Sequence, residues 1–156
     1  DLVRSRGLGD VYKRQGINAA MYKAGIEGKA YIQRCPANFE RPSYYIDAVR
    51  EVVRSDNKRL VHITSYFTIT YFPSLVKNHE YCTLEALIDA HSAVMSVFRN
   101  GYLQVEDRAI TVQSSSGGNA DDRVYIELQT EYYDDRVDPA AQPEEPVADS
   151  IAIDFE

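Results

Sequence analysis

Histidine is the residue type in this chain best suited to metal binding or general acid–base catalysis, and it occurs three times. None of His62, His79 and His91 has a second ligand two or four residues further along the chain. The sequence also lacks the HExxH and CxxC spacings that hold zinc. A metal centre would need distant partners to converge, so we expect surface or core roles for all three histidines.

The two cysteines give no better basis for an active site. Cys35 is followed by Pro36, which supplies no base, and no catalytic signature surrounds it. Cys82 adjoins the start of a predicted helix, whose N-terminus is expected to lower the thiol pKa a little. Structural or surface thiols are the expectation, in a reducing setting without a disulfide framework.

Gly117-Gly118 could be mistaken for a phosphate-binding loop. It lacks the GxxxxGK[ST] and GxGxxG spacings and does not open a helix, so we expect a flexible hairpin tip. The polar residues that follow lack the remaining spacing of a calcium loop and are expected to be solvated: Asn119, Asp121 and Asp122. The sequence therefore predicts no enzyme, no cofactor and no metal.

Tyrosine is the unusual feature of the composition, with 12 tyrosines and no tryptophan. Most of them fall on segments that we expect to be strands. Tyrosine suits half-buried positions on sheets, and it is also enriched at protein interfaces. Ordinary sheet packing and assembly contacts both remain open, and the candidate assembly contacts are Tyr66, Tyr71, Tyr125 and Tyr133.

Length and charge restrict the class of protein. The chain has 156 residues and 44% hydrophobic residues, which suits one domain with its own core. No apolar run reaches 18 residues, so no membrane span is expected. The net charge of -7 lies in residues 134–156, and the remainder is neutral, so no basic patch for sequence-specific nucleic-acid binding is indicated.

The first half of the chain predicts one helix followed by strands. Residues 16–26 have helical apolar spacing and end at glycines, and residues 29–35 suit a short strand. Residues 43–54 fit either a bulged strand or a helix, and we favour the strand. Residues 59–72 alternate clearly: Val61, Ile63, Phe67, Ile69 and Tyr71 share one face, and His62, Thr64, Tyr66, Thr68 and Thr70 share the other.

The second half predicts a helix and three further strands. Thr83 is a good N-cap for a helix over residues 83–99, whose apolar stripe comprises Leu84, Leu87, Ile88, Val94, Met95 and Phe98. Short strands are expected around residues 103–105 and 110–112, then a flexible loop over 114–122 and a strand over 123–133. The acidic segment 134–156 is expected to be disordered, although Ile151, Ile153 and Phe155 alternate as in a short strand.

These elements predict an α+β fold, with a mainly antiparallel sheet of five or six strands and two helices on one face. The expected division is a single α+β domain over residues 16–133, followed by the acidic flexible tail 134–156. Residues 1–15, DLVRSRGLGDVYKRQ, resemble translated sequencing-adapter read-through and are expected to be non-native, which would leave the true N-terminus missing. A basic arm for nucleic acid is the alternative for that segment.

The order and texture of these pieces resemble the tail terminator (tail-completion) proteins of siphophages and of prophages of Gram-positive bacteria. The resemblance covers roughly residues 17–135 and is carried best by the pieces SYYIDA and YFTITYFP, with the helix TLEALIDAHSAVMSVFRNG and the strands AITVQS and RVYIELQTEYY. It implies a structural protein of the virion tail, present in the host cytoplasm during assembly. It also implies a ring, commonly a hexamer, that caps the tail tube and meets the head-side connector.

Other functions remain open on the sequence alone. A different neck or head–tail joining protein would share the assembly role and differ in its partner. A small monomeric ligand-binding module would need a deep apolar pocket. If the resemblance holds, the partners are further copies of the chain, the tail-tube protein and the connector, and Ile151, Ile153 and Phe155 are further candidate contacts that could add a strand to a neighbour's sheet.

Overall fold

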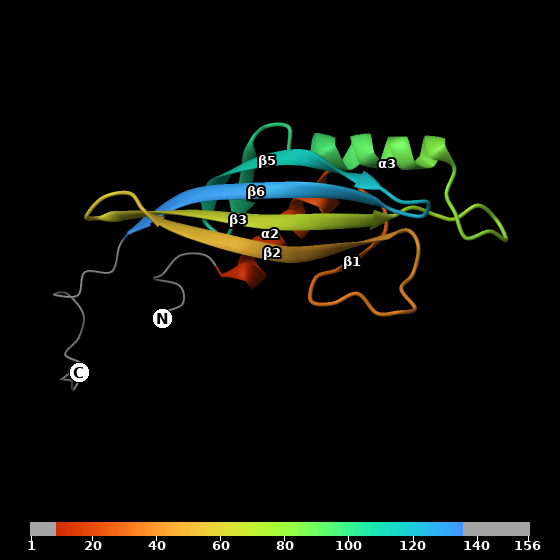
Figure 1. The fold of residues 1–156 in the computed structure, drawn as a ribbon, viewed down its shortest axis with the longest axis horizontal. Helices are drawn as coiled ribbons and strands as arrows, with labels where there is room; N and C mark the ends of the chain where they lie inside the picture. Colours follow the sequence, from red (N-terminus) through yellow and green to blue (C-terminus); the bar gives the residue numbers. More distant parts are fainter. Residues whose placement is uncertain (1–8, 136–156) are drawn as a thin grey trace.

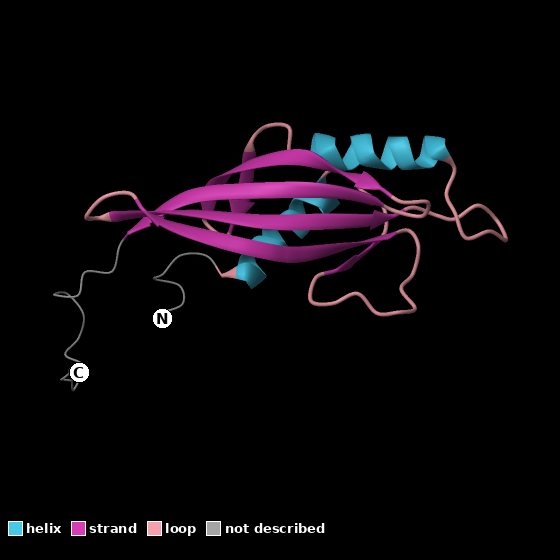
Figure 2. Ribbon diagram, in the orientation of Figure 1, coloured by secondary structure: helices cyan, strands magenta, loops and turns pink. Residues whose placement is uncertain are grey.

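The computed structural model describes residues 9–135 and shows one curled six-stranded sheet with two helices packed against it (Figures 1 and 2). The strand order is β1-β2-β3-β6-β5-β4, in which only the β1–β2 pair is parallel. This arrangement confirms the predicted α+β class. The elements are α2 (Asp10–Lys23), β1 (Lys29–Tyr31), β2 (Ser43–Ser55), β3 (Leu60–Phe72), α3 (Leu84–Val97), β4 (Tyr102–Val105), β5 (Arg108–Asn119) and β6 (Val124–Asp135).

The long hairpin of β2 and β3 forms the centre of the sheet. Residues 43–54, which fit two secondary structures, are a strand as predicted, because β2 pairs along almost its whole length with β3. A bulge between Ala48 and Arg50 absorbs the irregular apolar spacing. The alternation predicted for β3 is also confirmed, since Ile63, Phe67 and Ile69 are buried on one face.

The hydrophobic core lies between this face of the sheet and the two helices. β6 lies between β3 and β5 and contributes Val124, Ile126 and Leu128, all essentially inaccessible to solvent. Helix α2 crosses behind the sheet in Figure 2 and buries Ile17 and Met21 completely. Full burial of side chains of this size stabilises the fold by about 1.5–3 kcal/mol each.

Helix α3 begins as predicted, because the Thr83 hydroxyl oxygen accepts a hydrogen bond from the Ala86 N–H at 3.1 Å. The predicted apolar stripe is wrong in part. Leu87 and Val94 are buried against the sheet, but Leu84 is 68% exposed and Ile88 is 53% exposed. The helix turns the Leu87–Val94 side inward, which leaves the flank that carries Leu84 and Ile88 in solvent.

The loop predicted over residues 114–122 is also wrong in part, because β5 continues to Asn119. Ser114, Ser115 and Ser116 pair with residues 126–128 of β6. This pairing needs only main-chain groups, so serines extend the strand without an apolar pattern. The register shifts between Ser116 and Asn119, where Gly118 has a φ of 88°, and the true turn comprises the next few residues.

The boundaries differ from the expected ones in three places. β1 ends at Tyr31, and β6 continues through Asp134 and Asp135. Helix α2 begins at Asp10, and Lys13 is fully buried with its ammonium 3.1 Å from Glu51. The division into residues 1–15, 16–133 and 134–156 stays a prediction, and the strand expected over 151–155 lies outside the described residues.

Candidate assembly surface

The sheet face opposite the core carries three of the four predicted tyrosines. Tyr66 lies at the middle of β3, while Tyr125 and Tyr133 lie on the adjacent strand β6. The register sets Tyr125 beside Thr70 and Tyr133 beside His62, on the face that alternation assigns to Tyr66. Neither helix covers this face, which is turned toward the viewer in Figure 1. We call it the outer sheet face, defined by the even-numbered residues 62–70 of β3 and their cross-strand neighbours.

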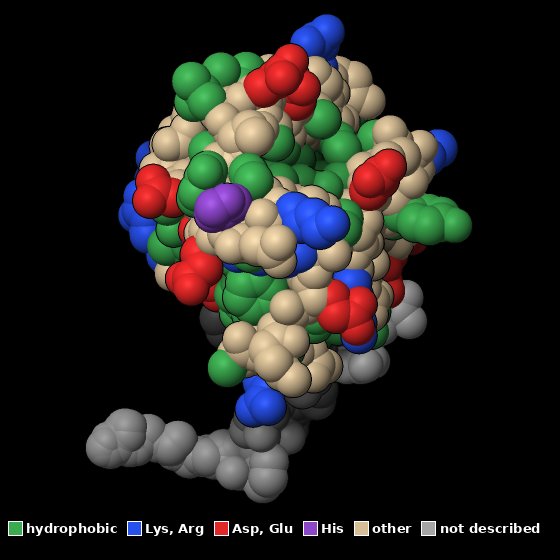
Figure 3. Space-filling view, turned by 90° about the vertical axis from the view of Figure 1, so that its right-hand side faces the viewer, with side chains coloured by type: hydrophobic (Ala, Val, Ile, Leu, Met, Phe, Trp, Pro, Cys, Tyr) green, Lys and Arg blue, Asp and Glu red, His purple; other side chains and the backbone are tan. Residues whose placement is uncertain are grey.

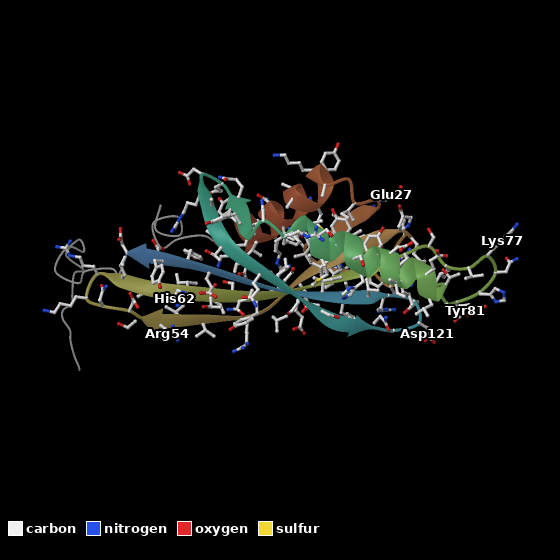
Figure 4. All side chains as sticks on the ribbon, turned by 90° about the horizontal axis from the view of Figure 1, so that it is seen from above. Glu27, Arg54, His62, Lys77, Tyr81 and Asp121 are labelled. Atoms are coloured by element: carbon white, nitrogen blue, oxygen red, sulfur yellow. The ribbon has the colours of Figure 1, made fainter. Side chains whose placement is uncertain are left out.

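A polar cluster occupies one end of the outer sheet face. His62 Nε2 lies 2.9 Å from a Glu131 carboxylate oxygen, and His62 Nδ1 lies 3.3 Å from the Arg54 guanidinium. Because a guanidinium can only donate, Nδ1 accepts this hydrogen bond and Nε2 donates to Glu131. The imidazole also stacks on the Tyr133 ring at 4.7 Å between centroids. Figure 4 shows Arg54 and His62 together, at the end of the molecule opposite Tyr81.

The centre of the outer sheet face is held by a cation–π contact. The Arg50 guanidinium lies 4.0 Å from the centroid of the Tyr66 ring. Arg50 follows the β-bulge, and its pairing with Tyr66 brings the two side chains to the same face. This contact orders a ring whose edge remains available to a partner, since Tyr66 is only partly buried.

Tyr71, the fourth predicted contact, lies in the core. Its hydroxyl donates a hydrogen bond of 3.0 Å to the Glu27 carbonyl oxygen, and its ring stacks near Tyr44 at 6.3 Å. Burial is the main cause that raises the pKa of both phenols. This hydrogen bond connects the segment after α2 to the end of β3.

The remaining candidate catalytic residues do not converge. His91 Nε2 is 2.9 Å from the Ser116 hydroxyl, far along the sheet from His62. Among residues 9–135, no three His, Cys, Asp or Glu side chains gather as a metal site. Burial raises the thiol pKa of both Cys35 and Cys82, so the small lowering expected for Cys82 is wrong. For Cys82, desolvation of the thiolate is the largest cause and outweighs the lowering of the pKa by the nearby Arg41 charge.

An ion-pair network that no sequence pattern predicts connects two loops. Arg41 donates hydrogen bonds to the carbonyl oxygens of Pro73 and Asp122 and pairs with the Asp122 carboxylate at 3.0 Å. Arg123 pairs with the same carboxylate at 2.9 Å. Arg41 and Asp122 are distant in sequence, so only the fold brings them together. We call these three residues the arginine clamp.

Charge on the visible end of the molecule is mixed. Figure 3 shows acidic and basic side chains interspersed among apolar ones at the right-hand end of Figure 1. That end therefore presents no continuous basic patch of the kind that binds nucleic acid. In the stretch from residue 9 to 135, neither helix is long and apolar enough to cross a membrane.

A comparison with protein families identifies the chain. The family described as "Phage tail terminator protein" matches residues 14–142, which is most of the sequence. No curated protein matches the chain. The family is structural and non-enzymatic, its members are proteins of the virion tail, and its partners are those of the tail tube in general. The uncovered sheet face, which carries three of the four tyrosines predicted as assembly contacts, fits that role. The chain belongs to the phage tail terminator protein family.

Proposed function

We propose that this protein forms a ring, such as a hexamer, that caps the tail tube and joins it to the head-side connector. Family membership supplies the tail role, and the uncovered outer sheet face supports a role in contacts. A closed ring needs heterologous contacts, in which one patch meets a different patch on the neighbour. The protein would assemble in the host cytoplasm before it is part of the virion tail.

The outer sheet face is the surface that we assign to the tube and to neighbouring copies. The observation that carries this assignment is the grouping of Tyr66, Tyr125 and Tyr133 on one face that neither helix covers. Tyrosine contributes a large rigid contact area and a hydroxyl at low cost in side-chain entropy. The arginine and carboxylate groups around these rings provide a polar rim, as in other protein interfaces.

The solution mass of the full chain tests the proposal, measured by light scattering after size exclusion with and without the tail-tube protein. We expect a ring-sized oligomer, either by itself or on the ends of tubes, together with tubes of limited length. A monomer that neither binds tubes nor changes their length would refute the proposal. Binding to the connector but not to the tube would assign the chain to another joining role.

A further inference from the structure

One edge of the sheet is left open in the described part of the chain. β4 pairs with β5 over four residue pairs only. These run from Val105 opposite Arg108 to Tyr102 opposite Thr111. The Val112 N–H still bonds to the Gly101 carbonyl oxygen at 2.9 Å. Beyond that bond, no described strand pairs with residues 113–119 on the side away from β6. An open edge presents main-chain N–H and C=O groups in a row, which is a template for a further strand.

Helix α3 runs alongside this open edge, in the opposite direction to β5. The Cys82 N–H donates to the Asp121 carbonyl oxygen at 2.9 Å just before the helix, and His91 meets Ser116 at 2.9 Å near its middle. Figure 1 shows α3 beside β5, and Met95 and Ser114 line one hollow of about 420 Å³ between them. The helix and the open edge therefore form two sides of one groove.

The exposed flank of α3 next to the groove carries an apolar strip, although the hollow itself is lined mainly by polar side chains. Leu84, Ile88 and Met95 fall within one narrow sector of α3, because they are spaced four and seven residues apart. Leu84 and Ile88 are among the most exposed large hydrophobic side chains of the described chain. A row of open main-chain groups next to an unpartnered apolar strip is the arrangement that binds an extended peptide with alternating apolar side chains.

We propose that residues 151–155 of a second copy of this chain add to the open edge of β5 as a strand. This inference rests on the proposed function and names one of its contacts. The segment reads IAIDF, so Ile151, Ile153 and Phe155 would face the helix while Ala152 and Asp154 face outward. These three side chains span about 14 Å in a strand, and the strip from Leu84 to Met95 spans about 16 Å along the helix.

Charge favours the antiparallel orientation relative to β5. Arg99 lies at the end of the groove that is nearest β4, together with Met95 and Ser96. A strand that runs antiparallel to β5 brings its own C-terminal end to this place. Asp154 and Glu156 would point to the other face of the added strand, but they would lie at the same end of the groove as the Arg99 guanidinium, and attraction between opposite charges favours this orientation.

The C-terminal end of β6 lies away from the groove of its own chain, an arrangement that suits donation to a neighbour in a ring. Asp135 pairs with Leu60, whereas Ser116 of the groove pairs with Ile126, nine residues earlier on β6. The exit of the chain and the groove are therefore about 30 Å apart, at opposite ends of the sheet. In a head-to-tail ring, the surface that donates a segment and the surface that receives it lie at different places on each copy. Residues 136–150 can span up to about 50 Å, so a neighbouring groove is within reach.

Disulfide trapping between two chains tests the proposal, with Cys35→Ser as the common background. One chain carries Ser115→Cys on the open edge and the other carries Ala152→Cys. Opposed residues of neighbouring strands have Cα atoms about 4.5–5.5 Å apart, within the range of a disulfide. We expect the oxidised mixture to give a disulfide-linked dimer. Gln113→Cys in place of Ser115→Cys tests a register shifted by two residues. Glu127→Cys on β6 is the control, and its yield of dimer with Ala152→Cys should be at least tenfold lower.

The outcomes separate the possible occupants. A linked monomer from one chain with both cysteines, and no dimer from the mixture, would show that the segment binds its own groove and would overturn the proposal. No link in either experiment would also overturn it. Replacing Leu84 and Ile88 together by serine should lower the yield of dimer several-fold, while Tyr22→Ser, another exposed side chain, should not. If the full chain forms rings but no dimer is trapped, the proposed function stands and this inference fails.

Discussion

The arginine clamp shows how single residues connect segments that are far apart in the sequence. Arg41 and Arg123 both contact the Asp122 carboxylate, and their guanidinium groups lie over the Phe72 ring. Hydrogen bonding from Arg123 is the largest cause that lowers the pKa of Asp122. The clamp therefore ties residues before β2 to the β5–β6 turn through one carboxylate.

The Asp122→Asn variant is expected to be less stable by about 1–2 kcal/mol at pH 7, because two charged hydrogen-bond donors lose an ionised acceptor. The folded pKa of Asp122 is lowered, so its stabilisation is present above the ordinary carboxylate pKa of about 4 and is lost as the pH falls through the folded value. Urea unfolding between pH 7 and pH 2 measures this. Asp121→Asn is the matched control, and an equal loss in both variants would contradict the argument.

The buried environment of Lys13 predicts how its replacement changes the free energy of unfolding. Its side chain is fully buried, and its ammonium group contacts Glu51, the Ser65 hydroxyl at 2.8 Å and the Tyr132 ring. Replacement of a buried ion by an apolar side chain of similar volume is often neutral or stabilising. We expect Lys13→Met to leave the free energy of unfolding unchanged or to raise it by about 1 kcal/mol, as measured by chemical denaturation. A loss of about 3 kcal/mol would show that the buried ion pair is essential to the fold.

Some helices and strands form from local sequence signals, and others form only because a distant segment pairs with them. Helix α3 has its own start signal at Thr83, and β3 has its own alternation, so both form where predicted. β5 lacks an apolar pattern beyond Val112 and exists there because β6 is beside it. Its far edge has no such partner among the described residues, and for that reason it is the place where a further strand can add.

Thr83→Ala tests the start of α3. The variant removes the acceptor of the Ala86 N–H and is expected to destabilise the protein by about 1 kcal/mol. Thermal unfolding followed by circular dichroism measures the change. Ser92→Ala, in the same helix and also exposed, should change stability by less than about 0.5 kcal/mol. Equal effects would mean that the cap does not contribute.

For the whole molecule, the separation of its two sheet faces is the decisive feature. One face holds the core beneath both helices, and the outer sheet face holds polar side chains with tyrosines (Figure 1). Because the side chains that stabilise the fold are on one face of the sheet, the other face is free to contact partners. Changes on the outer sheet face should therefore alter assembly while the fold remains intact.

Tyr133→Ser is the variant that tests this separation. Tyr133 is 51% exposed, so its loss should change the free energy of unfolding by less than about 1 kcal/mol. Removal of an aromatic contact at a centre of binding weakens association by about 2 kcal/mol or more, which is roughly thirtyfold. Sedimentation with tail-tube protein measures the binding. Tyr22→Ser on α2 is the control, and equal binding by both variants would exclude Tyr133 as a contact.

The sequence by itself determined the strands β3 and β6 and the capped helix α3, and it favoured a strand over residues 43–54. These elements have periods or end signals that adjacent residues encode. Alternation alone placed Tyr71 on one face of β3 with the apolar residues and Tyr66 on the other, as the structure has them. It did not identify the face of Tyr71 as the core, so Tyr71 was among the candidate contacts. The absence of metal-ligand and nucleophile spacings likewise indicated a protein without catalytic residues, in agreement with its family.

Only the tertiary structure decided which strands are neighbours and which surfaces stay open. The position of β6 between β3 and β5 depends on pairing between residues more than fifty positions apart, such as Phe67 with Leu128. No local pattern specifies such a pairing, because its energy comes from burial and main-chain bonds between distant segments. For the same reason, the arginine clamp, the exposed flank of Leu84 and Ile88, and the open edge of β5 were visible only once the sheet had closed around its core.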